Sequence, residues 1–298
     1  MRVAFVTGAT GFVGGHLATR LMSKGVEVHG LVRESSDTTR LASSHRFHAH
    51  LYDGSTESVC AALLAARPDI VFHVAALVRG HHEPADLSPL IRTNVELGAQ
   101  LLDAMRIAGV GRIVSTGSAW QHYDGRANSP VSLYAATKQA FEAILQYYVE
   151  ACRLRAVTLV LFDTYGPDDP RDKLFPLLRR AAMTGQPLRM TPGEQLIDLV
   201  YIDDVVDAYL AAAERLCGER PLGRERYAVS SGSLIGLRDL VQLFARITEQ
   251  PVAVEWGARP YRDREPMIPW RGGVGLPDWA PRVALEEGLR RMMAEGAP

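Results

Sequence analysis

Short apolar runs alternate with longer amphipathic segments over about the first 160 residues. The runs are rich in valine and isoleucine, and most lack alternating polar positions, as is typical of strands buried on both faces of a parallel sheet. The predicted strands are Val3–Val6, Val26–Val32, Ile70–Val74, Ile113–Ser115 and Val157–Phe162. Amphipathic spacing predicts helices at 12–24, 55–66, 86–109 and 132–152. This alternation predicts an α/β fold with a doubly wound parallel sheet.

The pattern loosens after Tyr165-Gly166-Pro167. Prolines and glycines become frequent, and short strands separate the predicted helices, which span about 172–184, 204–216, 236–248 and 283–294. We predict one domain at 1–165, to which 198–222 return. Residues 166–197 and 223–298 are predicted to form a smaller, partly interleaved substrate domain.

Composition narrows the classes of partner. The 298 residues are 47% hydrophobic and carry a formal net charge of -1, so neither a nucleic acid nor a membrane is a predicted partner. No apolar run reaches the roughly eighteen residues of a spanning helix, and the first residues lack a signal-peptide layout. Cys60, Cys152 and Cys217 are scattered without metal-ligand spacing. They predict reduced, buried thiols in a cytoplasmic protein that has no metal site.

A glycine turn follows the first predicted strand. Gly8, Gly11 and Gly14 are spaced three apart. Such glycines allow a tight turn, close approach of a pyrophosphate, and tight helix packing. The helix that begins near Phe12 and Val13 would direct its N-terminal N–H groups at the phosphates. A turn without a ligand is the alternative, but its position between a strand and a helix favours dinucleotide binding.

Two further residues bear on which dinucleotide binds. Arg33 ends the second strand, where NAD-binding proteins usually carry an acidic residue, and an arginine there suits a 2′-phosphate. Arg33 therefore favours NADP, with NAD as the other possibility; the alternative is a solvated arginine beside Glu34. Asp53 follows the third strand and could accept a hydrogen bond from the adenine amino group, or could begin the next helix as an N-terminal acid.

Tyr134 and Lys138 are four residues apart, on one face of a predicted helix. A neighbouring ammonium lowers the pKa of a tyrosine, which is ordinarily about 10, and the same lysine can hold the ribose of a nicotinamide nucleotide. A hydride that reaches a carbonyl carbon requires a proton for the oxygen, which such a tyrosine supplies. Ser118, or in reserve Thr116, would bind that oxygen from the end of the preceding strand. An ordinary surface pair is the alternative to this catalytic set of Ser118, Tyr134 and Lys138.

Five segments carry a family resemblance: Thr7–Gly14, Phe72–Ala76, Tyr134 with Lys138, Tyr165–Pro167 and Leu199–Val205. Together they resemble the extended short-chain dehydrogenase/reductases, the NAD-dependent epimerase/dehydratase family. The resemblance implies a Rossmann domain, a C-terminal nucleotide-sugar domain and a Ser–Tyr–Lys triad. It further implies that Ala75, Ala76 and Leu77 line the cofactor cleft, with Asn94 beneath the active site. Family dimers pair the helices that here span about 88–108 and 132–152, which implies a homodimer, although these apolar faces could equally be core.

Four segments resemble one branch of this family more closely: Gly117–Tyr123, Pro130–Glu142, Asp163–Pro167 and Arg259–Glu265. They are similar to CDP-abequose synthase-like 4-ketoreductases, which reduce a nucleotide-linked 4-keto-6-deoxyhexose.

The chain departs from the family pattern at four positions. Sugar-nucleotide dehydratases carry Asp-Glu after the catalytic hydroxyl, where this chain has Ala119-Trp120, so dehydration is not expected. Asp163 and Ile197 replace the usual asparagine and arginine. Because a missing arginine removes a diphosphate clamp, other groups must bind the substrate. The candidates are Trp120, Gln121, His122, Asp163, Lys173, Arg259 and Arg262. His122 could equally be a loop histidine, and the charged candidates could be solvated surface groups.

These observations predict an NADPH-dependent reductase of a nucleotide-linked keto sugar. Tyr134 would donate the proton, Lys138 would lower the pKa of Tyr134 and hold the ribose, and Ser118 would bind the carbonyl oxygen. One alternative is a nucleotide-sugar 4-epimerase with tightly held NAD. Another is a non-catalytic NADP-binding sensor, which the intact Tyr134–Lys138 pair disfavours. The sequence names neither the sugar nor the nucleotide.

Overall fold

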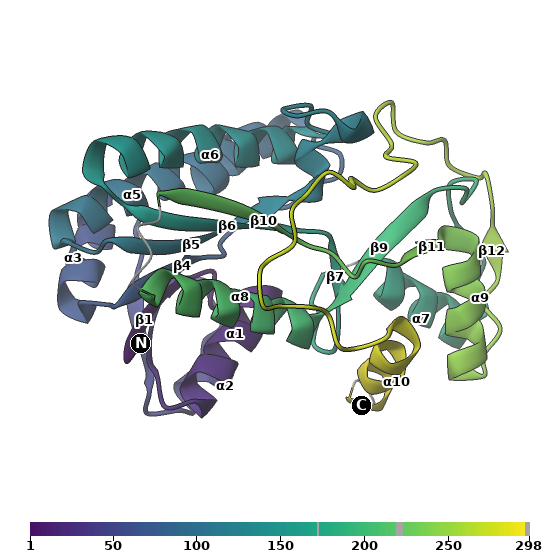
Figure 1. The fold of residues 1–298 in the computed structure, drawn as a ribbon. Coiled ribbons are helices and arrows are strands. Elements are labelled where there is room, and N and C mark those ends of the chain that lie inside the picture. The colour runs from purple at the N-terminus through teal and green to yellow at the C-terminus, as the bar shows by residue number, and fades with distance from the viewer. Residues whose placement is uncertain (172, 219–222, 296–298) are drawn as a thin grey trace.

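A computed structural model describes residues 1–171, 173–218 and 223–295 (Figure 1). Its larger sheet has seven parallel strands in the order β10-β6-β5-β4-β1-β2-β3. At the carboxyl end of β1, Thr7 pairs with Leu31 of β2 and His73 of β4, which places three strand ends together. The strands are β1 (Val3–Thr7), β2 (Glu27–Val32), β3 (Phe47–Leu51), β4 (Ile70–His73), β5 (Arg112–Ser118), β6 (Arg155–Leu161) and β10 (Arg224–Val229).

Helices cover both faces of this sheet. α1 (Phe12–Ser23) and α8 (Ile202–Cys217) pack against each other on one face, with the short α2 (Thr39–Ala42) beside α1. On the other face lie α3 (Thr56–Ala66), α5 (Leu97–Ala108) and α6 (Leu133–Cys152). Each face has its own apolar core. The predicted doubly wound α/β sheet is confirmed.

The helix expected over 86–109 is divided. Residues Pro84–Asp86 form a 3₁₀ turn, α4 spans Leu87–Ile91, and a π-helical turn at Arg92–Glu96 precedes α5. A π turn inserts extra backbone into a helix and rotates the residues that it carries. Here it carries Asn94, which the turn directs into the protein interior.

The second part of the molecule has two small sheets. β7 (Asp163–Tyr165), β9 (Leu196–Tyr201) and β11 (Leu234–Gly236) form one, and β8 (Leu188–Arg189) pairs with β12 (Val254–Glu255). α7 (Leu174–Thr184), α9 (Leu237–Thr248) and α10 (Leu285–Glu295) surround them (Figure 1). We expected all of 223–298 in this part, but β10 joins the edge of the large sheet beside β6. Its charged start, Arg224–Arg226, obscures a strand whose remaining residues are buried.

The chain after β12 is fastened to α8. The Asp204 carboxylate accepts hydrogen bonds from the backbone N–H groups of Arg282 and Val283, both at 3.0 Å. The Trp279 indole N–H donates to the Asp204 carbonyl at 3.0 Å. These bonds hold residues 279–283, which precede α10, against α8, a helix that packs on the large sheet.

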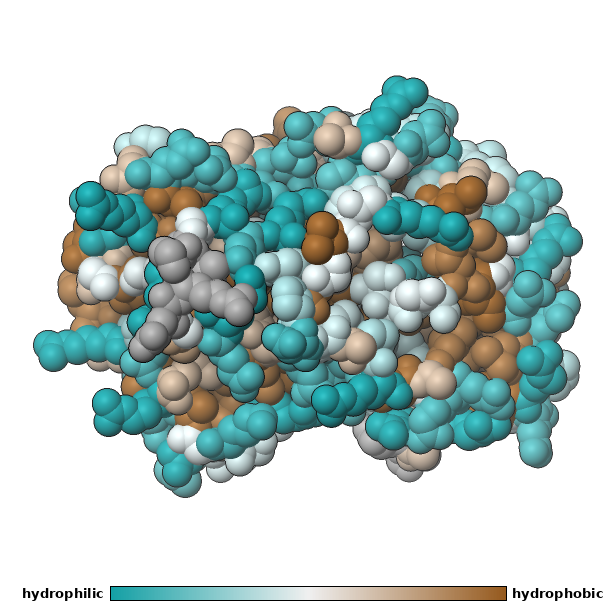
Figure 2. All heavy atoms as spheres, viewed as in Figure 1, coloured by the Kyte–Doolittle hydropathy of each residue, from teal (hydrophilic) through white to brown (hydrophobic). Residues whose placement is uncertain are grey.

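Hydrophilic residues dominate the surface shown in Figure 2, with hydrophobic residues in separate patches between them. No helix in the described ranges is both long and apolar enough to cross a membrane. Cys217 is exposed, in contrast to the buried thiol expected, because it ends α8.

Candidate active site

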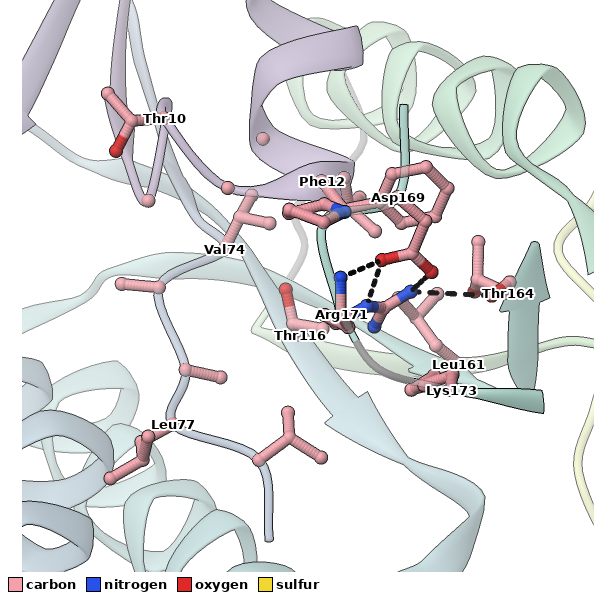
Figure 3. Close-up of a pocket in the computed structure, with 18 of the residues that line it drawn as sticks. Thr10, Phe12, Val74, Leu77, Thr116, Leu161, Thr164, Asp169, Arg171 and Lys173 are labelled. Carbon is pink, nitrogen blue, oxygen red and sulfur yellow. Dashed lines mark hydrogen bonds and ion pairs between the residues drawn. The ribbon is translucent and has the colours of Figure 1, made fainter. Parts of the chain in front are cut away.

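A cleft of 2320 Å³ runs along the carboxyl ends of the central strands. In Figure 3, Val74 and Leu77 lie on one side of it, and Asp169, Arg171 and Lys173 lie on the other. Fifteen of the predicted site residues line this cleft: Gly8, Gly11, Phe12, Val13, Gly14, Arg33, Asp53, Ala75, Ala76, Leu77, Ser118, Trp120, Tyr134, Asp163 and Lys173.

The glycine turn leaves no room for side chains. Gly8 has a φ of +72°, and a Cβ there would lie 2.7 Å from the Ala75 backbone nitrogen. A Cβ on Gly14 would overlap the Gly8 carbonyl oxygen and lie 2.7 Å from its carbon. The Gly11 N–H donates to the Gly8 carbonyl at 3.0 Å, and Gly11 is the N-cap residue of α1. The turn therefore presents bare backbone and a helix N-terminus to the cleft, which is a fitting cradle for a pyrophosphate.

Asn94 has a structural position and does not line the cleft. It is 1% exposed, and its Oδ1 accepts from the Leu77 N–H at 2.8 Å. Its Nδ2 donates to the Leu77 carbonyl and to Thr137 Oγ1, both at 2.9 Å. Asn94 therefore lies beneath the active site, as the resemblance implies; its amide joins the Leu77 loop to α6 and holds one wall of the cleft in place without lining it.

Asp53 has two roles in the structure. Its carboxylate lines the cleft and accepts hydrogen bonds from the Ser55 N–H at 2.8 Å and hydroxyl at 2.6 Å. These bonds hold the pKa of Asp53 below its usual value. The predicted alternative, an acid before a helix, thus coexists with a place on the wall of the cleft.

Tyr134 lies near the start of α6, and its phenol lies beside Ser118, which ends β5. Burial raises the pKa of Tyr134 to about 12, while the neighbouring Ser118 hydroxyl opposes that rise. The Thr116 hydroxyl bonds instead to the His73 carbonyl at 2.9 Å and to the Tyr209 hydroxyl at 2.6 Å. Of the two predicted hydroxyls, Ser118 is therefore the one beside the phenol.

Lys138 lies one turn further along α6 and is 1% exposed. Among the described residues, none forms a hydrogen bond with its Nζ. Burial lowers the pKa of Lys138 to about 8, and Glu142 opposes this shift. Burial is the largest influence on both groups, so the expectation that Lys138 lowers the pKa of Tyr134 stays a prediction. An unpartnered buried ammonium fits the ribose hydroxyls of a dinucleotide, although Lys138 is not among the residues that line the cleft.

Two predicted substrate residues point away from the cleft. Gln121 is fully buried; its Oε1 accepts from the Ser118 N–H at 2.8 Å and its Nε2 donates to Glu142 at 2.8 Å. His122 stacks on Trp270 at a centroid distance of 4.0 Å, and its Nε2 lies 2.7 Å from Arg226 Nη2. The 3₁₀ turn Ala119–Gln121 rotates these side chains off the line of β5, so the substrate assignments of Gln121 and His122 are wrong.

The two arginines predicted to bind the substrate, Arg259 and Arg262, also lie outside the lining of the cleft. Arg259 is exposed, and its backbone N–H bonds Met190 at the start of a surface loop. Arg262 forms an ion pair with Glu265 at 2.7 Å and lies over the Trp120 ring, 4.9 Å from the centroid. Glu265 thus neutralises the charge of Arg262, and the guanidinium packs on Trp120.

Asp163 and Lys173 bring opposite charges to the substrate side of the cleft. Burial raises the pKa of Asp163, which Lys173 opposes most among its charged neighbours. Burial lowers the pKa of Lys173, and Asp163 opposes that shift. Each side chain therefore favours the charged form of the other.

Three residues at or near the site escaped the sequence analysis: Asp169, Arg171 and Glu142. Arg171 bonds Asp169 twice at 2.6 Å and lies over the Phe12 ring at 4.8 Å (Figure 3). The charged run after Pro167 gave no sign of this pairing. Glu142, which contacts Gln121, could have been found because it repeats the four-residue spacing from Tyr134 to Lys138.

Residues 4–221 match the family model described as the NAD dependent epimerase/dehydratase family. The chain belongs to this family. As a family member it is an NAD(P)-dependent oxidoreductase of the extended short-chain dehydrogenase/reductase type, which confirms the resemblance seen in the sequence.

Several known proteins are similar to this family member over nearly their whole lengths. CDP-abequose synthase of Yersinia pseudotuberculosis is 26% identical, over 90% of this chain and 92% of its own. UDP-glucose 4-epimerase of Mycolicibacterium smegmatis is 28% identical, over 96% of each. The crystal structure of UDP-glucuronic acid 4-epimerase from Bacillus cereus with UDP-glucuronic acid and NAD matches with a TM-score of 0.87, at 22% identity over 98% of both chains. This structural match shows a shared fold.

Proposed function

We propose that the protein uses NADPH to reduce the carbonyl of a nucleotide-linked 4-keto-6-deoxyhexose. The observation that carries the proposal is the Ser118–Tyr134 pair at the cleft. Both side chains can contact one carbonyl oxygen. Ala119 and Trp120, which follow Ser118 in the sequence, cannot ionise, so they supply no acid–base pair for dehydration. The similarity to CDP-abequose synthases and to UDP-sugar epimerases supports a nucleotide sugar as the substrate class.

In the proposed reaction, NADPH supplies the hydride when bound. The glycine turn binds the pyrophosphate, and the Lys138 ammonium donates hydrogen bonds to the ribose. Ser118 hydrogen-bonds the substrate carbonyl oxygen, and Tyr134 gives that oxygen its phenolic proton. Tyr134 is protonated at neutral pH and therefore holds the proton that a general acid must give. The Lys138 ammonium then stabilises the phenolate that forms.

The test is oxidation of NADPH and NADH by the purified protein, with CDP- and dTDP-4-keto-6-deoxyglucose supplied separately. We expect NADPH to be consumed with either the CDP-linked or the dTDP-linked sugar. NMR of the product should show a hydroxyl at C4. If the protein binds NADPH but reduces neither keto sugar, the ketoreductase proposal fails.

A nucleotide-sugar 4-epimerase is the second candidate, favoured by the similarity to UDP-glucose 4-epimerase. An epimerase oxidises and then reduces the same carbon, so it keeps its cofactor. Tightly bound NAD in the purified protein, with interconversion of C4 epimers and no net oxidation of added NADPH, would select this candidate.

Arg33 underlies the proposed preference for NADPH. Its side chain is exposed at the end of β2, lines the cleft, and forms no ion pair or hydrogen bond with any residue that the structure describes. We expect Arg33→Ala to raise the KM for NADPH about ten- to a hundredfold, because a charge-assisted bond to the 2′-phosphate is lost. The KM for NADH serves as the internal control and should stay within about twofold. An equal loss for both nucleotides would show that Arg33 does not select the 2′-phosphate.

We further propose the homodimer that the resemblance implies. Ile107 of α5 and Tyr147 of α6 are exposed and would lie in that interface.

A further inference from the structure

Gln121 connects the end of β5 to the middle of α6. It is fully buried, and the Ser118 N–H donates to its Oε1 at 2.8 Å. The Gln121 Nε2 donates to Glu142 Oε1 at 2.8 Å and to Gln139 Oε1 at 3.1 Å. Both ends of its amide are therefore satisfied, and the side chain holds one orientation.

Glu142 is a buried carboxylate one helical turn after Lys138. It is 4% exposed, a position at which an acidic side chain requires partners. Two arginines of β10 supply them: Arg224 contacts Oε2, and Arg226 Nε lies 3.1 Å from the same atom. Strand β10 thus holds Glu142 in place beneath the active site.

The ionisable groups around Lys138 are one carboxylate, two neutral side chains and, further away, two arginines. Glu142 favours the ammonium from the same helix, against the burial that lowers the pKa of Lys138. His73 of β4 is buried with its pKa lowered to about 3, so it is neutral, and Lys138 contributes to that shift. Tyr134 is a neutral phenol one turn earlier. The arginines of β10 lie beyond Glu142 and would act unopposed if its charge were removed.

We propose that Gln121 and Glu142 are positioning residues that join Ser118 and Lys138 into one hydrogen-bonded and electrostatic unit. Gln121 fixes the backbone that carries the Ser118 hydroxyl, and Glu142 maintains the Lys138 ammonium. The proposal rests on the proposed function in that it takes Ser118 and Lys138 as the working groups. Neither positioning residue lines the cleft.

The lysine content of the chain permits a test that does not depend on turnover. Lys24, Lys138 and Lys173 are its three lysines, so ¹³Cε-lysine NMR of the whole protein gives three signals. Loss of one signal in Lys138→Met assigns Lys138. In Glu142→Gln, which keeps the shape of the side chain, we expect the titration midpoint of Lys138 to fall by about one pH unit or more. Glu150→Gln is the matched control: it removes an exposed carboxylate from the same helix and should leave the midpoint unchanged.

A second variant keeps the proposal testable if Glu142→Gln does not fold. Arg226→Gln removes one cation from Glu142, so the Lys138 midpoint should rise, opposite in sign to the first variant. An unchanged midpoint in either folded variant overturns the electrostatic part of the proposal.

Gln121→Met tests the link to Ser118. We expect kcat to fall about tenfold with the KM within about twofold, because the substrate still meets the same cleft. A change in KM alone overturns this part. If the wild-type protein reduces no keto sugar while the NMR shifts occur as expected, the proposed function fails and the electrostatic unit stands.

Discussion

Tyr134→Phe is expected to lower kcat by about 10²–10⁴-fold, the usual contribution of a positioned general acid. The substitution removes the phenolic oxygen beside Ser118 and keeps the ring, which packs edge-on to Trp120 at a centroid distance of 6.4 Å. The cleft should therefore keep its shape, and NADPH affinity should stay within about twofold. Initial-rate kinetics and calorimetric titration with NADPH measure the two quantities.

The matched control is Tyr147→Phe, which removes a hydroxyl from an exposed tyrosine of the same helix. Its kcat should equal that of the wild type. Full turnover in Tyr134→Phe would place the acid elsewhere. If instead the protein has a signalling role that survives this substitution, the non-catalytic sensor becomes the better interpretation.

Gly14→Ala should abolish nucleotide binding. The added methyl group would overlap the Gly8 carbonyl oxygen, and backbone rather than a flexible side chain opposes it. The turn and the first turn of α1 must separate, which removes the cradle for the pyrophosphate. We expect NADPH to raise the Tm of the wild type and to leave that of Gly14→Ala unchanged, since a ligand stabilises only the state that binds it.

Gly111→Ala provides the control for a general loss of glycine. Nothing lies within 4 Å of a Cβ at Gly111, and its φ lies outside the left-handed region. Its Tm, and the increase on addition of NADPH, should match those of the wild type. A Gly14→Ala protein that binds NADPH normally would show that the turn can widen.

The parts of the site that local spacing determines were predictable. The glycine turn follows from three positions between a strand and a helix, and the Tyr134–Lys138 pair follows from the helical repeat. The α/β sheet was equally evident, because its buried strands are continuous apolar runs. In each case the pattern that identifies the feature lies within a short stretch of the sequence.

The parts that long-range contacts determine were not predictable. Gln121 and His122 follow Ser118 directly, yet a 3₁₀ turn sends them toward Glu142 and Trp270. Arg262 looked like a phosphate ligand, but Glu265 neutralises it. Asn94 was expected beneath the active site, but the π turn that directs its amide to the Leu77 loop was not foreseen. Such outcomes depend on partners that the sequence pattern does not identify.

The return of the chain to β10 constrains how this enzyme can be divided or diversified. A fragment that stopped at residue 165 would lack α8, whose Val205 and Tyr209 are buried, and would leave β6 as an unpaired sheet edge. An unpaired edge of that kind invites aggregation. The two halves are therefore not interchangeable modules that recombination can join end to end. New substrate preferences in this chain must arise by substitutions within the loops that line the cleft, with the scaffold inherited whole.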